Sequence, residues 1–90
     1  MTPPYILAID QGTTSSRALI VDRTGAIVGL GQEPLTQYYP QPGWVEHDPE
    51  EIWATTLEAI GVALAQAGLA FGDIACIGLT NQRETAVAWE

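Results

Sequence analysis

The chain has 90 residues, and its 11 acidic residues against 3 arginines give a formal net charge of −8. This charge excludes the basic surface of a nucleic-acid-binding protein, and the lack of lysine excludes a Walker-type phosphate loop. Hydrophobic residues make up 47% of the chain, as in globular domains, and no apolar stretch reaches the ~18 residues of a membrane span. The single cysteine, Cys76, cannot form an internal disulfide, and its apolar neighbours predict that it is buried. We expect a cytoplasmic protein.

The first 22 residues predict two strands joined by a polar turn. Residues 5–10 are apolar until Asp10, and a second strand is expected over residues 16–22. The first strand is apolar on both faces, which is typical of a strand covered on both sides. Asp10 is a candidate ligand of a hydrated magnesium ion, because hard divalent cations bind carboxylate and water oxygens.

The turn itself has the residue types of a phosphate-binding loop. Gly12 allows a positive φ and a close approach of the backbone to a ligand. Hydroxyl and backbone N–H groups suit phosphate oxygens, and the turn offers both at Thr13, Thr14 and Ser15. An ordinary hairpin turn uses similar residues, so both interpretations stay open at this point.

A second hairpin turn and a long loop follow. Residues 22–25 predict a tight turn with Gly25 in the left-handed conformation, leading into a third strand over residues 26–33. Gly29 and Gly31 in that strand indicate bulges or close packing. Residues 37–47 contain two prolines and predict a loop that Trp44 and Val45 pin to the body of the domain.

The next segment has strong helix signals. Asp48 is a predicted N-cap, Pro49 the first helical residue, and Glu51 the partner in a capping box. Gly68 is the predicted stop, which gives a helix of about 19 residues. Apolar residues and a threonine recur at helical spacing and predict the buried face: Ile52, Thr56, Ile60 and Leu64.

A fourth strand is expected over residues 74–80, apolar throughout, and a fifth over residues 85–89 that is cut off by the end of the chain. The predicted fold is a mixed α/β sheet in the order β-β-β-α-β, as part of an incomplete domain. A helical crossover normally makes the flanking strands parallel, so we expect the strands at 5–10 and 74–80 to be neighbours.

If these two strands are neighbours, two polar clusters meet at one edge of the sheet. Residues 10–15 follow the first strand and residues 81–84 follow the fourth, and ligands of open α/β sheets bind at such carboxyl ends. Arg83 and Glu84 offer donors and acceptors that suit the adjacent hydroxyls of a polyol. A solvated charge pair in a turn is the alternative interpretation.

Three blocks of residues resemble one known family. Residues 10–17 (DQGTTSSR) are similar to the first phosphate loop of the ribonuclease H-like superfamily of actin, heat-shock ATPases and sugar kinases. Together with residues 42–49 (PGWVEHDP) and 80–85 (TNQRET), they resemble the FGGY carbohydrate kinases, and in particular the branch that phosphorylates glycerol. The likeness covers nearly the whole chain, so residues 1–90 would form the N-terminal part of the first kinase domain.

The resemblance implies ATP-dependent phosphorylation of glycerol to sn-glycerol 3-phosphate, with Mg²⁺. The residues implied in binding ATP or ADP are Asp10, Gly12, Thr13, Thr14, Ser15 and Arg17, with Asp10 near the metal. The residues implied in binding glycerol are Gln82, Arg83 and Glu84. His47, beside the helix cap, is expected to be structural.

The family's catalytic base and adenosine site are expected downstream of this chain, so residues 1–90 alone should be inactive. The complete enzyme is expected to be a homo-oligomer. Two alternative functions stay open: another FGGY sugar kinase, or a non-catalytic nucleotide-binding module of the actin or heat-shock type.

Overall fold

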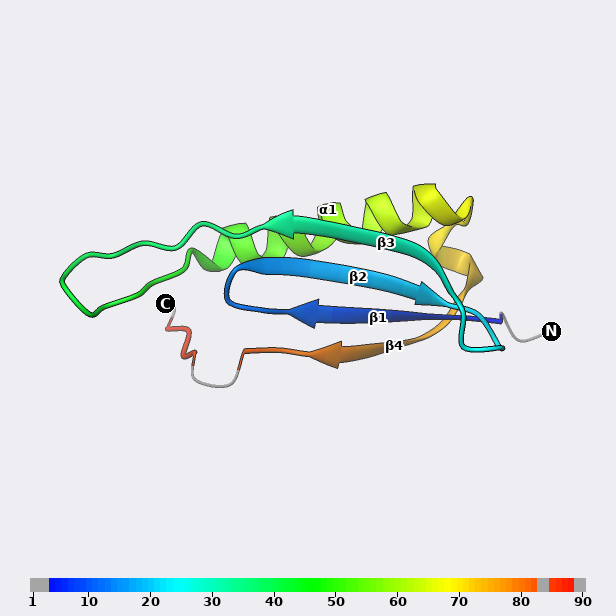
Figure 1. The fold of residues 1–90 in the computed structure, drawn as a ribbon, viewed down its shortest axis with the longest axis horizontal. Coiled ribbons are helices and arrows are strands. Elements are labelled where there is room, and N and C mark those ends of the chain that lie inside the picture. Colours follow the sequence, from blue (N-terminus) through cyan, green and yellow to red (C-terminus); the bar gives the residue numbers. More distant parts are fainter. Residues whose placement is uncertain (1–3, 83–84, 89–90) are drawn as a thin grey trace.

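Four strands form one mixed sheet in the computed structural model, which describes residues 4–82 and 85–88 (Figure 1). The elements are β1 (Tyr5–Gln11), β2 (Ser15–Val21), β3 (Ile27–Pro34), helix α1 (Pro49–Ala67), a 3-10 turn (Phe71–Asp73) and β4 (Ile74–Thr80). The strands lie in the order β3-β2-β1-β4, with β1 antiparallel to β2 and parallel to β4. This confirms the predicted order of elements and the parallel pairing of the two apolar strands.

The turn between β2 and β3 forms as predicted. Gly25 has a φ of +88°, and Asp22 Oδ1 accepts hydrogen bonds from the Thr24 hydroxyl at 2.7 Å and from the N–H groups of Thr24 and Ala26. The Thr24 hydroxyl, followed by the Ala26 N–H, holds the pKa of Asp22 below its ordinary value. The turn therefore favours an ionised aspartate.

Helix α1 begins and ends where the sequence predicts. Asp48 caps it by accepting a hydrogen bond from the Glu50 N–H at 3.0 Å, Pro49 is the first helical residue, and Gly68 ends it with a φ of +70°. The predicted role of Glu51 is different. Its carboxylate accepts from the Thr36 N–H at 2.6 Å instead of completing a capping box, because the preceding loop passes within its reach. α1 is also not long and apolar enough to cross a membrane, nor is any other described helix.

Small residues let α1 lie very close to the sheet. A Cβ atom on Gly31 would lie 1.9 Å from the Ala59 carbonyl oxygen, and one on Gly29 would lie 2.3 Å from the Ala63 carbonyl oxygen. The close packing predicted for these two glycines is therefore confirmed. The pairing of β2 with β3 also shifts register beside Gly29, where Ile20 and Val21 face Gly29 and Ile27.

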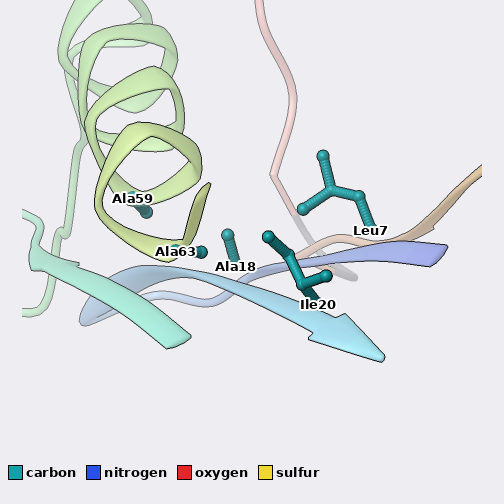
Figure 2. Packing of buried hydrophobic residues seen from close by; sticks show 5 residues of the cluster. All are labelled: Leu7, Ala18, Ile20, Ala59 and Ala63. Carbon is teal, nitrogen blue, oxygen red and sulfur yellow. The ribbon is translucent and has the colours of Figure 1, made fainter. Parts of the chain in front are cut away.

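The buried face of α1 differs from the predicted one. The helix buries Thr55, Ala59 and Ala63, whereas the larger residues at the predicted positions lie beside this stripe and are only partly buried. The reason is the short distance to β3, which leaves room for small side chains only. Figure 2 shows Ala59 and Ala63 facing Ala18 and Ile20 of β2 in the core, which also includes Leu7 of β1.

The half of the sheet beyond β1 is uncovered. α1 packs on β3 and β2 and has little contact with β1, so β4 is an exposed edge strand in which Ile77 is 51% and Leu79 68% exposed. The residues of β4 after Ile74 are exposed, so the prediction that Cys76 is buried is wrong. Residues 85–88 form no strand, so the fifth strand is not found in its described part.

The loop between β3 and α1 projects from the body as a narrow hairpin (Figure 1). Tyr38 and Glu46 pair across it through two backbone hydrogen bonds of 2.8 and 2.7 Å, and Gly43 turns the chain with a φ of +83°. Trp44 is 54% exposed and Val45 53%, so the prediction that they pin the loop is wrong. Their side chains lie on the projecting hairpin that this backbone pairing forms.

Candidate functional site

The turn between β1 and β2 lies at the carboxyl end of β1, beside the end of β4. Asp10 is exposed there and pairs in register with Arg17 of β2 on one side and Thr80 of β4 on the other. The Gly12 N–H donates to the Ser15 carbonyl at 3.0 Å and closes the turn. The described part of the second polar cluster, residues 81 and 82, therefore lies with residues 10–15 at one edge of the sheet, as predicted.

Gly12 does not have the predicted positive φ, since the described glycines with positive φ are Gly25, Gly43 and Gly68. Its small size matters for a different reason. A Cβ atom at this position would lie 3.3 Å from the Ser15 carbonyl oxygen, which is tighter than an ordinary contact. The turn therefore needs a small residue for close packing and not for an unusual backbone angle.

Two glutamines hold the Gly12 carbonyl. Gln11 Nε2 donates to it at 3.1 Å, and Gln82 Nε2, from the segment after β4, donates at 3.0 Å. The Gln82 Oε1 in turn accepts a hydrogen bond from the Thr85 hydroxyl. Both lone pairs of the Gly12 oxygen are thus used by protein donors.

The next two carbonyls of the turn are also held. His47 Nε2 lies 2.9 Å from the Thr13 carbonyl oxygen, and the Leu35 N–H donates to the Thr14 carbonyl at 2.9 Å. His47 therefore contacts the turn as well as standing beside the helix cap. Sequence reasoning placed His47 next to the cap but did not foresee this contact.

The N–H groups of the same turn are in the opposite situation. Within residues 4–82 and 85–88, neither the Thr13 N–H nor the Thr14 N–H has a protein acceptor, and both residues are exposed. Adjacent free N–H groups and hydroxyls form a concave binding site for anions. The turn can therefore hold an anion such as a phosphate group.

A buried polar network supports the turn from behind. Gln11 Oε1 accepts hydrogen bonds from the hydroxyls of Ser16 at 2.7 Å and Thr56 at 2.8 Å, and the Ser16 and Thr55 hydroxyls lie 2.8 Å apart. Gln11, Ser16 and Thr55 are all buried, and no buried side-chain polar atom of the described residues lacks a partner. A satisfied network of this kind fixes its members, so α1 orients Gln11 and through it Gly12.

Asp10 is suited to a hydrated metal ion and not to a complete protein cage. The described residues contain no cluster of three or more His, Cys, Asp or Glu side chains that could enclose a metal. Mg²⁺ commonly keeps several waters and binds one or two carboxylates together with substrate phosphates. The exposed Asp10 carboxylate beside the turn therefore suits magnesium that is bound through a nucleotide.

Near this site, the Glu51 carboxylate of α1 accepts hydrogen bonds from Thr36 and Tyr38 of the projecting loop. The Thr36 N–H, followed by the Thr36 side chain, lowers the pKa of Glu51. The negative charge of Glu51 raises the pKa of Tyr38, whose hydroxyl donates to Glu51 Oε2 at 3.3 Å. The loop that carries His47 is thus tied to the first turn of the helix.

An open cavity of about 720 Å³ lies beside the turn. Thr13, His47 and Gln82 contribute to its wall, together with residues 85–87. Of the residues predicted to bind a polyol, Gln82 lies in this wall, whereas Arg83 and Glu84 lie outside the described residues.

Thr14 and Ser15 follow Thr13 in the turn between β1 and β2. Ser15 Oγ accepts a hydrogen bond from Gln32 Nε2 at 3.0 Å.

Comparisons with known proteins agree with this geometry. Residues 5–90 match the family model described as the FGGY family of carbohydrate kinases, N-terminal domain. A glycerol kinase of Rhizobium rhizogenes is 58% identical over 86 residues, which are 96% of this chain and 17% of that protein. The chain therefore spans 17% of the length of this curated relative.

Solved structures of similar fold are also sugar kinases. A xyloylose kinase from Brucella ovis superposes with a TM-score of 0.80 and 33% identity, over 87% of this chain and 16% of its own. A Plasmodium falciparum glycerol kinase with ADP superposes with a TM-score of 0.76 and 36% identity, over 90% of this chain and 16% of its own. These matches confirm the predicted actin and sugar-kinase type of fold.

Proposed function

We propose that this chain, which belongs to the FGGY family of carbohydrate kinases, supplies the phosphate loop and part of the polyol site of an ATP-dependent glycerol kinase. Residues 1–90 would be the N-terminal part of its first domain. The observation that carries the proposal is the turn after β1, whose carbonyls are held by protein donors while the Thr13 and Thr14 N–H groups have no protein acceptor within the described residues. The relatives named glycerol kinase support glycerol as the substrate.

At the nucleotide end, the hydroxyls and N–H groups of Thr13, Thr14 and Ser15 would bind the phosphates of ATP and ADP. Arg17, two residues beyond Ser15, would add a positive charge in a chain that has no lysine. Asp10 would hold the water shell of Mg²⁺, which when bound neutralises charge on the phosphates. The chain's own contribution is to orient the phosphates and exclude alternative geometries.

At the polyol end, Arg83 and Glu84, which fall outside the described residues, would bind glycerol, and the preceding residue Gln82 contacts the loop. An arginine and a carboxylate together can donate to and accept from adjacent hydroxyls. One terminal hydroxyl would then face the phosphoryl group held by the loop, giving sn-glycerol 3-phosphate. The catalytic base would come from another part of the enzyme.

The proposal includes two further points about the whole enzyme. The enzyme would work in the cytoplasm, because ATP is held inside cells. It would assemble as a homo-oligomer. The competing functions are another FGGY sugar kinase, which the xyloylose kinase neighbour exemplifies, and a non-catalytic nucleotide-binding module.

Kinetics of the full-length kinase test the proposal. We expect turnover with glycerol and ATP, and much weaker turnover with xylulose or gluconate. Arg83→Ala should weaken transition-state binding by about 1.5–3 kcal/mol, seen as a higher KM for glycerol with little change for ATP, because a charged hydrogen bond to the polyol is lost. The 90-residue chain alone is a control that should show no turnover. Preference for another sugar, or equal effects of Arg83→Ala on both substrates, would contradict the proposal.

A further inference from the structure

We infer that Gln82 and His47 are positioning residues that aim the Thr13 and Thr14 N–H groups at the bound phosphate. The inference rests on the proposed function, because it deepens the role of the phosphate loop. It assigns to both residues a contact with the loop backbone, in place of the contact with glycerol that the resemblance implies for Gln82.

The physical reason lies in the planarity of the peptide bond. In a trans peptide unit the C=O and the following N–H lie in one plane and point in opposite directions. The Gly12 carbonyl and the Thr13 N–H share one such unit, and the described backbone contains no cis peptide bond. A donor that fixes the Gly12 oxygen therefore also fixes the direction of the Thr13 N–H. The Thr13 carbonyl fixes the Thr14 N–H in the same way.

Each of these carbonyls is held by a side chain from a distant segment. Gln82 Nε2 lies 3.0 Å from the Gly12 oxygen and is 70 residues away in sequence, and His47 Nε2 lies 2.9 Å from the Thr13 oxygen and is 34 residues away. Both side chains are half-buried. The two N–H groups they aim are the ones without a protein acceptor in the described chain.

The two positions are not equivalent. The Gly12 carbonyl has a second donor, Gln11 Nε2 at 3.1 Å, so it stays partly fixed when Gln82 is changed. Within the described residues, His47 is the one donor to the Thr13 carbonyl. We therefore expect a larger loss at His47 than at Gln82.

The Thr85 hydroxyl explains how Gln82 presents its donor. This hydroxyl donates to Gln82 Oε1, which leaves the NH₂ end of the amide directed at Gly12. A glutamine whose oxygen and nitrogen both have partners on the protein is held in one orientation. Gln82 is therefore engaged with the loop even before a substrate binds.

The test uses three variants of the full-length kinase and calorimetric titration with MgADP. His47→Ala should weaken MgADP binding about tenfold, and Gln82→Met, which keeps the side-chain length but removes the donor, about threefold. KM for ATP should rise in parallel, while KM for glycerol stays within about twofold. Gln41→Met changes an exposed glutamine of the projecting hairpin between β3 and α1. This variant is the matched control, and it should leave the MgADP affinity and the KM for ATP unchanged.

A conservative variant separates positioning from general support of the fold. His47→Gln places an amide NH₂ near the position of the imidazole Nε2, so it should restore MgADP affinity to within about twofold of the wild type. If His47→Ala does not fold, His47→Gln and Gln82→Met still decide the question. The inference is overturned if His47→Gln binds as weakly as His47→Ala, or if Gln82→Met raises KM for glycerol instead of that for ATP.

Failure of the proposed function would have a different signature. A wild-type enzyme that binds MgADP but does not phosphorylate glycerol would contradict the proposed function. The MgADP affinities of the variants would then still decide the roles of Gln82 and His47.

Discussion

The two halves of the sheet have strands of similar apolar character but very different burial. On the β2–β3 side, α1 covers the strands, and Ala18 and Ile20 are completely buried. On the β4 side, Ile77 and Leu79 are more than half exposed. The difference comes from α1, which can lie on β3 because Gly29 and Gly31 offer no side chain to displace it. Strand hydrophobicity alone therefore does not decide which half is covered.

Adding a side chain between α1 and the sheet should have the largest effect on the free energy of unfolding. We expect Gly31→Ala to destabilise the chain by about 3 kcal/mol or more, since its Cβ would lie 1.9 Å from a backbone oxygen of α1 that cannot move alone. Urea unfolding followed by circular dichroism measures this. Gly78→Ala in β4 is the control, since its Cβ meets nothing within 4 Å, and it should stay within about 0.5 kcal/mol. Equal effects at the two glycines would contradict the comparison.

Removing a large side chain should also destabilise the covered half of the sheet more than the uncovered half, but by a smaller difference in the free energy of unfolding. Ile20→Ala should cost about 2–4 kcal/mol, because it leaves a cavity in the core under α1. Ile77→Ala should cost less than about 1 kcal/mol, because half of that side chain is already exposed. The same unfolding experiment applies. A loss at Ile77 that matches the loss at Ile20 would show that β4 is covered in solution.

The smallest effect should appear in the pH dependence. Glu51 has a lowered pKa, so the stability it contributes is present above the ordinary glutamate pKa of about 4.3 and is lost as pH falls through the lower folded value. Wild type and Glu51→Gln should therefore differ at pH 7 and converge in acid. Urea midpoints of both proteins between pH 7 and 2 measure this. A constant difference across the range would show that the Thr36 contact does not depend on the charge of Glu51.

Local signals explain how much of the fold is predictable. Asp48, Pro49 and Gly68 fix the bounds of α1, and the crossover it forms makes β1 and β4 parallel. The buried face of α1 was not predicted correctly. The spacing rule selects large apolar residues, whereas the close approach to Gly31 selects small ones, and that distance is a tertiary property.

The candidate site divides in the same way. The hydroxyls of the turn after Asp10 indicate a phosphate loop because they are contiguous in sequence. The contacts of His47 and Gln82 with that turn span 34 and 70 residues, so no local pattern reveals them. Gly12 of the turn was expected to have a positive φ, but the structure needs it for its small size.

The bond between Gln82 and Gly12 also has a consequence for the order of folding. The β1–β2 and β2–β3 pairs are local hairpins, but the β1–β4 pair and the Gln82 contact close a loop of 70 residues. Contacts of large sequence separation carry a greater loop-closure entropy and form late in slower-folding topologies. The hairpins and α1 should thus assemble before β4 docks. The turn between β1 and β2 would acquire its final shape only in this last step, so a chain that has not yet paired β4 holds its core but not the final geometry of this turn.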